Sequence, residues 1–138
     1  MSTQLLLASE VLDVHYDLDN AWLYLDWKGP QELELVQAAC QHLTEFIKQT
    51  GARKALNDNT HITQTSWELV KWVAYEYLPE AGRLGVEQVA WVQSPLPGCR
   101  SRLDLMDDFV SDKPQVAIFQ DMAAAYEWLS SASVPAHH

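Results

Sequence analysis

The pattern of apolar and polar residues along this chain has two different periodicities, and the changes from one to the other mark the secondary-structure elements. Short apolar runs bounded by turn formers predict strands. The first two runs are separated by Asp17-Leu18-Asp19-Asn20, so they form a hairpin. The pattern leaves open whether residues 5–7 add another strand or extend the first. The predicted strands are 11–16, 21–27, 54–57, 88–93 and 116–120.

Between these strands, apolar residues recur every three or four positions, which predicts helices. The first helix begins at Pro30, where a missing N–H costs little, and ends at Gly51. The second runs from Thr65 to Leu78 and stops before Pro79, because the residue before a proline disfavours helical geometry. The irregular segment 94–113 contains a further helix near 102–109. The last helix covers 122–130 and is capped by Asp121.

Strands that alternate with helices require a largely parallel sheet with right-handed crossovers. The predicted fold class is therefore α/β: a single domain over residues 1–130, with a mixed, mostly parallel sheet, an N-terminal antiparallel hairpin and about four helices. Residues 131–138 are predicted to be a disordered tail. With 138 residues and 48% hydrophobic content, the chain is long enough to bury its own core.

Charge and cysteine content narrow the function classes. The net charge of −10 repels nucleic acid, which is therefore not expected as a partner, and it discourages docking on an anionic lipid surface. The apolar run at the N-terminus is too short for a signal core or a membrane span, and the protein is expected in the cytoplasm. Cys40 and Cys99 form no metal or disulfide motif. Cys40 is predicted to be buried, whereas Cys99, close to Arg100 and Arg102, is predicted to lie in a surface loop with no particular role.

Five stretches carry a resemblance to a known family: YLDWKGPQ (24–31), ALNDNTHITQTSWE (55–68), WVAYEYLPEA (72–81), VAWVQSP (89–95) and FQDMAAAYEWL (119–129). In this order they resemble the SpoIIAA-like family of STAS/SEC14-type domains, in particular small bacterial proteins. The resemblance implies a SpoIIAA-like fold. It also implies one of two roles: a phosphorylation-controlled partner of kinases and anti-sigma factors, or a binder of lipids and small apolar ligands under movable helices. Enzymatic activity is not what the resemblance implies.

The junction between the third strand and the second helix holds the candidate chemistry. Thr65-x-x-Glu68 fits a capping box. The alternative use of Ser66, as a phosphoacceptor, is opposed by the nearby charges of Asp58 and Glu68. The segment also departs from the Asp-Ser-Ser/Thr-Gly pattern of the phosphorylated relatives, since no glycine follows a serine pair.

A polar rim is predicted at the carboxyl ends of the central strands, where open α/β sheets bind ligands. Gln120 and Asp121 end a neighbouring strand and are expected at the same rim. Asx side chains that shape turns are the alternative explanation of this polarity. The candidate ligand-binding residues are Asn57, Asp58, Asn59, His61, Ser66, Trp67, Gln93 and Ser94.

The second helix carries apolar residues on more than one face. Leu69, Trp72 and Tyr75 project away from its main stripe and are the candidate interface. A second copy in a homodimer, the irregular segment after Ser94, or a bound apolar ligand or membrane could cover them. The remaining tryptophans in strands and helices are interpreted as packing residues: Trp22, Trp27, Trp91 and Trp128.

Catalytic, metal-binding and cofactor motifs are absent from the sequence. His61, Asp58 and Ser66 could form a nucleophile set, but no GxSxG turn accompanies them. The sequence therefore predicts a non-enzymatic regulatory or protein-interaction module with an unknown protein partner. The alternative is a lipid- or small apolar ligand-binding module with a cleft between the second helix and the sheet.

Overall fold

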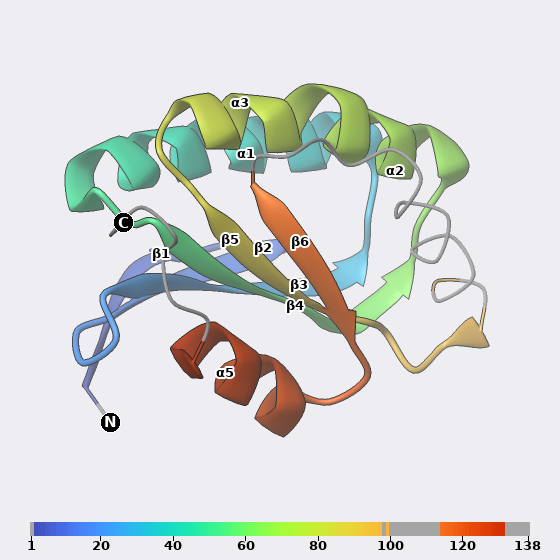
Figure 1. The fold of residues 1–138 in the computed structure, drawn as a ribbon. Coiled ribbons are helices and arrows are strands. Elements are labelled where there is room, and N and C mark those ends of the chain that lie inside the picture. Colours follow the sequence, from blue (N-terminus) through green and yellow to red (C-terminus); the bar gives the residue numbers. More distant parts are fainter. Residues whose placement is uncertain (1, 98, 100–113, 132–138) are drawn as a thin grey trace.

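The computed structural model describes residues 2–97, 99 and 114–131 (Figure 1). Within these residues, six strands and two helical layers form one α/β unit. The strands are β1 (Thr3–Ala8), β2 (Leu12–Asp17), β3 (Trp22–Pro30), β4 (Lys54–Gln64), β5 (Gln88–Val92) and β6 (Gln115–Phe119). The helices are α1 (Leu33–Thr50), α2 (Trp67–Trp72), the π-helical segment η1 (Val73–Tyr77), α3 (Leu78–Arg83) and α5 (Met122–Ser131).

The strands form one sheet in the order β1-β2-β3-β4-β5-β6. The β1–β2 and β2–β3 pairs are antiparallel, and the three pairs from β3 to β6 are parallel. The predicted mixed sheet with its N-terminal hairpin is confirmed. The segment that the pattern left undecided is a strand of its own, β1, which lies at the edge of the sheet beside β2.

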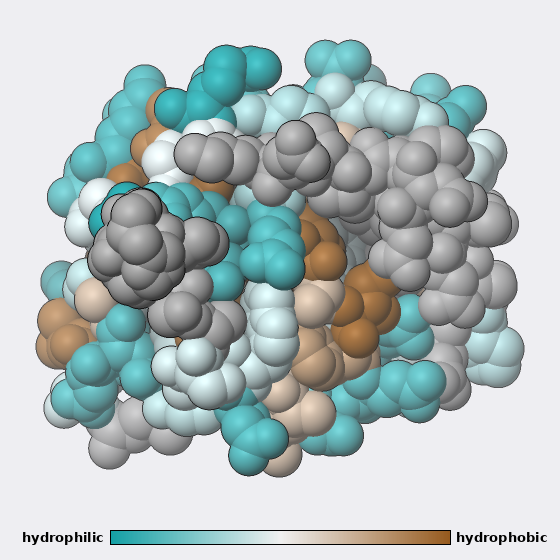
Figure 2. Space-filling model, in the orientation of Figure 1, coloured by the Kyte–Doolittle hydropathy of each residue, from teal (hydrophilic) through white to brown (hydrophobic). Residues whose placement is uncertain are grey.

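The helices lie on opposite faces of the sheet (Figure 1). Helix α1 and the continuous rod α2–η1–α3 cover one face and enclose the larger core, whereas α5 covers the other face and encloses the smaller one. Strand β6 is the second edge, and its apolar side chains are only half-buried. Figure 2 shows hydrophobic residues over this strand.

Helix α1 begins three residues later than the sequence predicts. Pro30 is the last residue of β3, where it pairs with Gln64 of β4, and Glu32 is the N-cap. The helix ends as predicted at Gly51, whose φ of 66° is left-handed and whose N–H donates to Ile47 O at 2.9 Å. The predicted start of this helix was too early. The fixed φ of Pro30 fits the extended backbone at the end of β3, and here it does not begin a helical turn.

The second helix does not end at Pro79, so that prediction was wrong. The rod continues to Arg83, with Pro79 in the first turn of α3. The preceding turn is π-helical, and the N–H of Leu78 donates to Val73 O, five residues back. A wider turn displaces the carbonyls that a proline ring would otherwise meet, which lets the helix pass through the proline.

The C-terminal elements match the prediction closely. Strands β5 and β6 and helix α5 differ from their predicted bounds by one residue at most. Asp121 caps α5, since its Oδ1 accepts from the N–H of Ala124 at 2.8 Å. The helix predicted near 102–109 and the tail after residue 131 lie outside the described residues.

Candidate functional site

A cavity of about 80 Å³ lies between the sheet and the layer formed by α1 and α2–η1–α3. Strands β3, β4 and β5 form its floor and the helices its roof. Most of the lining is apolar, from Leu23 and Leu25 on the floor to Val36, Leu43 and Val73 on the roof. It is more than large enough for one water molecule, which needs roughly 10–15 Å³, and about half the size of an engineered 150 Å³ cavity that binds benzene.

One end of the cavity is polar. Asn57 and Asn59 are each 6% exposed and line it beside Trp27. The indole Nε1–H of Trp27 donates to Asn57 Oδ1 at 2.8 Å, and Asn57 Nδ2 donates to Asn59 Oδ1 at 3.3 Å. Gln31 and Thr65 also line the cavity. This end lies toward the carboxyl ends of the parallel strands, the edge at which α/β sheets bind ligands.

The opposite end of the cavity is apolar. Ile47 near the end of α1, Ala81 in α3 and Val86 before β5 line it and are all at most 4% exposed. Tyr77 connects the rod to α1, because its hydroxyl lies 3.2 Å from Thr44 Oγ1 and donates to Cys40 O at 3.3 Å. The cavity is therefore amphipathic along the direction of the strands.

Trp91 lines the same cavity from β5, directly beside Asn57 in the parallel register. Its side chain is buried, and its Nε1 has no hydrogen-bond partner among the described residues. The sequence predicts the same packing role for Trp27 and Trp91. The structure separates them, since only the first has a partner for its indole N–H.

The polar triplet at 57–59 is divided between the two faces of the sheet. Strand β4 runs to Gln64 and does not end at residue 57, so the three side chains alternate. Asn57 and Asn59 face the cavity, whereas Asp58 faces the side that α5 covers. The predicted single rim at the end of a short strand was wrong, because β4 continues beyond β5 by pairing with β3 alone.

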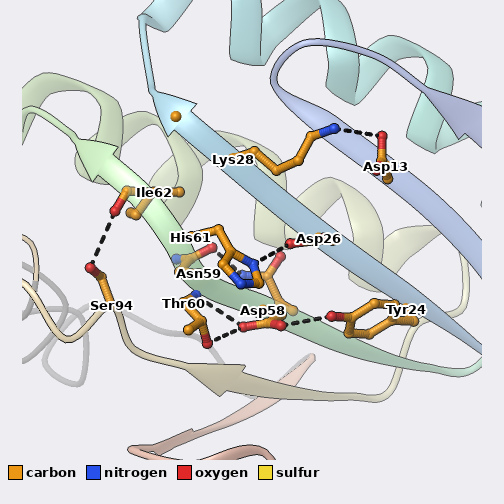
Figure 3. A network of polar contacts seen from close by, with 12 residues as sticks. Asp13, Tyr24, Asp26, Lys28, Asp58, Asn59, Thr60, His61, Ile62 and Ser94 are labelled. Carbon is orange, nitrogen blue, oxygen red and sulfur yellow. Dashed lines mark hydrogen bonds and ion pairs between the residues drawn. The ribbon is translucent and has the colours of Figure 1, made fainter.

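On that other face, Asp58 is the centre of a hydrogen-bond network (Figure 3). It is 2% exposed and accepts from Tyr24 Oη at 2.7 Å, from the Thr60 N–H at 2.9 Å and from Thr60 Oγ1 at 2.5 Å. Burial, and then the hydrogen bond to Asp58, raise the pKa of Tyr24. The phenol is therefore held in its protonated, donating form.

Asp26 and His61 lie next to this network (Figure 3). His61 Nδ1 is 3.1 Å from Asp26 Oδ1. One ligand atom from each of Asp26, Asp58 and His61 lies within 4.8 Å of the others, a grouping of donor types that suits a divalent cation. Sequence spacing missed it, because Asp26 meets Asp58 only through the register of β3 with β4.

The helix cap lies one residue later than predicted. Ser66, not Thr65, is the N-cap of α2, and its Oγ accepts from the Leu69 N–H at 3.1 Å. Thr65 lines the cavity instead. Trp67 is half-buried, with Lys71 Nζ 5.9 Å from the centre of its ring.

The hydrogen bonds of the described residues do not assemble a nucleophile set. His61 is bonded to Asp26 and Ser66 to the Leu69 amide, and neither bond joins these residues to one another. Within the described part of the chain, the geometry therefore gives Ser66 a capping role and gives His61 a carboxylate partner.

The first two residues after β5 are buried. Gln93 and Ser94 are 6% and 1% exposed. Ser94 Oγ donates to Ile62 O at 3.4 Å and accepts from the Leu96 N–H at 3.1 Å. Cys99 is 4% exposed and lines the cavity, so its predicted place in a surface loop was wrong.

The three candidate interface residues occupy different depths. Leu69 is 7% exposed and lines the cavity, so it belongs to the interior. Trp72 is half-buried and stacks on Tyr77, with ring centres 5.7 Å apart. Tyr75 is 49% exposed. The prediction that Leu69 projects away from the inner face was wrong, because Leu69 and Val70 are both buried and both line the cavity.

Comparisons with known proteins define the fold. An uncharacterised protein of the DUF3478 family from Shewanella loihica PV-4, described as having a SpoIIAA-like fold, aligns with a TM-score of 0.54 and 16% identity over 93% of this chain and 92% of that one. SiaC of Pseudomonas aeruginosa aligns with a TM-score of 0.51 and 10% identity over 86% of this chain and 100% of that one. Its apo structure gives 0.50 and 13% identity over 86% and 98%. The chain has a SpoIIAA-like fold.

Sequence comparison adds no nearer relative: no protein-family model and no curated protein matches the chain. Among the described residues, no helix has the length and apolar character needed to cross a membrane.

Proposed function

We propose that this protein is a non-enzymatic regulatory module that acts by binding a protein partner, and that its first partner is a second copy of itself. The rod α2–η1–α3 is the contact surface. Its supporting observation is the distribution of apolar side chains on this rod: the inner side lines the cavity, while Tyr75 is 49% exposed on the outer side, beside the half-buried Trp72. The SpoIIAA-like fold supports the same role by analogy.

Charge favours this surface for contact between two copies. The chain carries a net charge of −10, so two copies repel each other over most approaches. The rod from residue 67 to 83 is close to neutral, with Glu68, Glu76 and Glu80 against Lys71 and Arg83. Arg83 is also paired with Glu80, at 2.6 Å. An approach through this rod therefore meets less repulsion than one through the acidic remainder of the surface.

Two further observations support a non-enzymatic module in a reducing compartment. Cys40 and Cys99 are free thiols and both are buried, as expected for a protein of the cytoplasm. The hydroxyl of Ser66 is engaged in the helix cap. The burial of the two thiols and the capping bond of the Ser66 hydroxyl are both structural roles.

Native mass spectrometry tests the proposal. The wild-type protein is expected to be a dimer, and Tyr75→Glu and Trp72→Glu are expected to shift it to the monomer, because each puts a charge into an apolar contact. Leu35→Glu is the matched control: Leu35 is 47% exposed on α1, and its replacement should leave the dimer unchanged. A monomeric wild type, or a dimer that tolerates both substitutions in the rod, would contradict the proposal.

Binding of a small apolar ligand is the second candidate function, favoured by the cavity under the rod. Its volume of about 80 Å³ suits a small molecule better than a long acyl chain. Native mass spectrometry of the same preparation distinguishes the two candidates. A dimer without an adduct favours the interaction module, and a bound small-molecule mass favours the ligand-binding module.

A further inference from the structure

We infer that Asp26, Asp58 and His61, on the face of the sheet that α5 covers, bind a divalent transition-metal ion, and that zinc fits them best. The inference goes beyond the proposed function and does not rest on it, because the rod α2–η1–α3 lies on the opposite face. One ligand atom of each of the three residues lies within 4.8 Å of the others. Two carboxylates and one imidazole are a donor set that suits zinc.

A β-bulge in β4 turns His61 to the same face as Asp58. The register of β4 with β3 shifts between these two residues. Asn59 and Ile62 both line the cavity although they are an odd number of positions apart, which a regular strand with alternating side chains does not allow. The extra residue therefore directs the imidazole away from the cavity and toward the carboxylates. Bulges that re-aim a side chain in this way are over-represented next to active sites.

Asp58 is a buried carboxylate with no cationic side chain paired to it among the described residues. It is 2% exposed, and its hydrogen bonds come from the Tyr24 hydroxyl and from the amide and hydroxyl of Thr60, which are neutral donors. Asp26 lies beside it in the strand register and has an ion pair with His61 alone within the same part of the chain. Buried charges in proteins are paired or coordinate metals, so these two neighbouring carboxylates favour a bound cation.

The lysine of this region is engaged elsewhere. Lys28 Nζ lies 3.0 Å from Asp13 Oδ1, and Figure 3 shows it pointing toward that carboxylate and away from Asp58. The ion pair satisfies Asp13 and leaves the charge of the other two carboxylates to be balanced at the cluster itself.

The side chains combine a fixed ligand with adjustable ones. Tyr24 and Thr60 hold the Asp58 carboxylate, in the way that outer-sphere hydrogen bonds orient metal ligands. A carboxylate has about four acceptor positions, so one remains for an ion. The side chains of His61 and Asp26 are 61% and 20% exposed and can adjust to admit an ion from solvent. Their Nδ1 and Oδ1 atoms are 3.1 Å apart, close to the roughly 3.4 Å between two ligand atoms of a tetrahedral zinc ion.

Isothermal titration calorimetry of the full chain with zinc chloride tests the inference. One ion per chain is expected, and His61→Ala and Asp26→Asn should each weaken its binding about tenfold or more. Neither residue is buried, so both variants should fold, which far-UV circular dichroism checks. Tyr24→Phe, which removes a hydrogen bond from Asp58 and no ligand atom, should weaken zinc binding about tenfold. His42→Ala is the matched control, because His42 is exposed on α1 and its loss should change the affinity by less than about twofold.

Three results would overturn the inference. Equal zinc binding by the wild type, His61→Ala and Asp26→Asn would place the ion elsewhere on the chain, which has four further histidines. Absence of binding at about 1 mM zinc would exclude the site. Magnesium chloride that displaces zinc at equal concentration would indicate only a general attraction to the net charge of −10, because magnesium prefers oxygen ligands to imidazole. The oligomeric state is measured separately in zinc-free buffer, so failure of the metal site leaves the proposed dimer untouched.

Discussion

The indole N–H of Trp27 donates to Oδ1 of Asn57 across β3 and β4, and this bond is the buried polar link at the floor of the cavity. It joins two residues that are 7% and 6% exposed. Neither group can reach solvent, so each is the hydrogen-bond partner of the other. Asn57 Nδ2 in turn donates to Asn59 Oδ1. The bond therefore stabilises the fold only as long as both partners are present.

Replacement of one partner should cost more than the bond itself is worth. Asn57→Leu leaves the N–H of Trp27 buried and unpaired, which is expected to lower the free energy of unfolding by about 1–3 kcal/mol. In the double variant Trp27→Phe/Asn57→Leu, no donor is stranded, so the loss should be smaller than the sum of the two single losses by about 1 kcal/mol. Urea unfolding of the four proteins measures this coupling. Strictly additive losses would show that the two residues do not depend on each other.

The cap of the second helix gives a prediction that separates neighbouring residues. Ser66→Ala removes the acceptor of the Leu69 N–H and should lower the free energy of unfolding by about 1 kcal/mol. Ser66→Asp, which keeps a capping oxygen, should recover most of that loss. Thr65→Ala should cost less, because Thr65 is not the cap. Urea unfolding ranks the variants, and a larger loss for Thr65→Ala would restore the capping box that the sequence predicts.

Local rules predicted the order of the elements and several of their ends. Gly51 ends α1 because the left-handed backbone there suits glycine, and Asp121 caps α5 because its carboxylate accepts from the Ala124 amide. Both devices operate within a few residues, so the sequence alone reveals them. Pro79 was misread because the rule for proline assumes an α-helical turn before it, whereas a π-helical turn precedes it here.

The candidate site was less accessible to sequence reasoning, since it depends on pairing between distant segments. Asn57 and Asp58 are neighbours in sequence but face opposite sides of the sheet, and only the length of β4 reveals this. Asp26 meets Asp58 through the strand register. Trp27 and Trp91 occupy similar apolar strands, and no local pattern shows that only one of them has a partner for its N–H.

Alkaline pH should destabilise the protein in a step assigned to one thiol. Burial raises the pKa of the Cys40 thiol to about 12, from an ordinary value of 9.0. Above pH 9 the unfolded chain therefore loses this proton while the folded chain keeps it, so the free energy of unfolding should fall as pH rises, by up to about 1.4 kcal/mol per pH unit for this group. The stabilisation is fully present below pH 9 and is lost as pH rises toward 12.

Urea unfolding at several pH values measures this decline, and Cys40→Ala should flatten it between pH 9 and pH 10. Tyr24 and Tyr77, whose pKa values are also raised chiefly by burial, should add to the decline above pH 10, the ordinary value for a phenol. An unchanged slope in Cys40→Ala below pH 10 would exclude the thiol as its source.

The cavity predicts that a larger residue at its apolar end stabilises the protein. Ala81 is 4% exposed and lines the cavity from α3, so the added methyl groups of Ala81→Val would be buried in existing space. Valine adds two carbons to alanine, and each contributes about 0.8 kcal/mol when it is buried. After subtraction of about 0.6 kcal/mol for valine in a helix, the free energy of unfolding should rise by about 1 kcal/mol.

Ala38→Val is the matched control, because Ala38 is exposed on α1 and its replacement brings only the cost of valine in a helix. Urea unfolding should therefore give opposite signs for the two variants. A natural cavity that can be filled with a gain in stability is space that the fold itself does not require, as expected where a ligand binds. A loss of stability in Ala81→Val as large as that in Ala38→Val would mean that this end of the cavity has no room to fill, and would remove the support it gives to a ligand site.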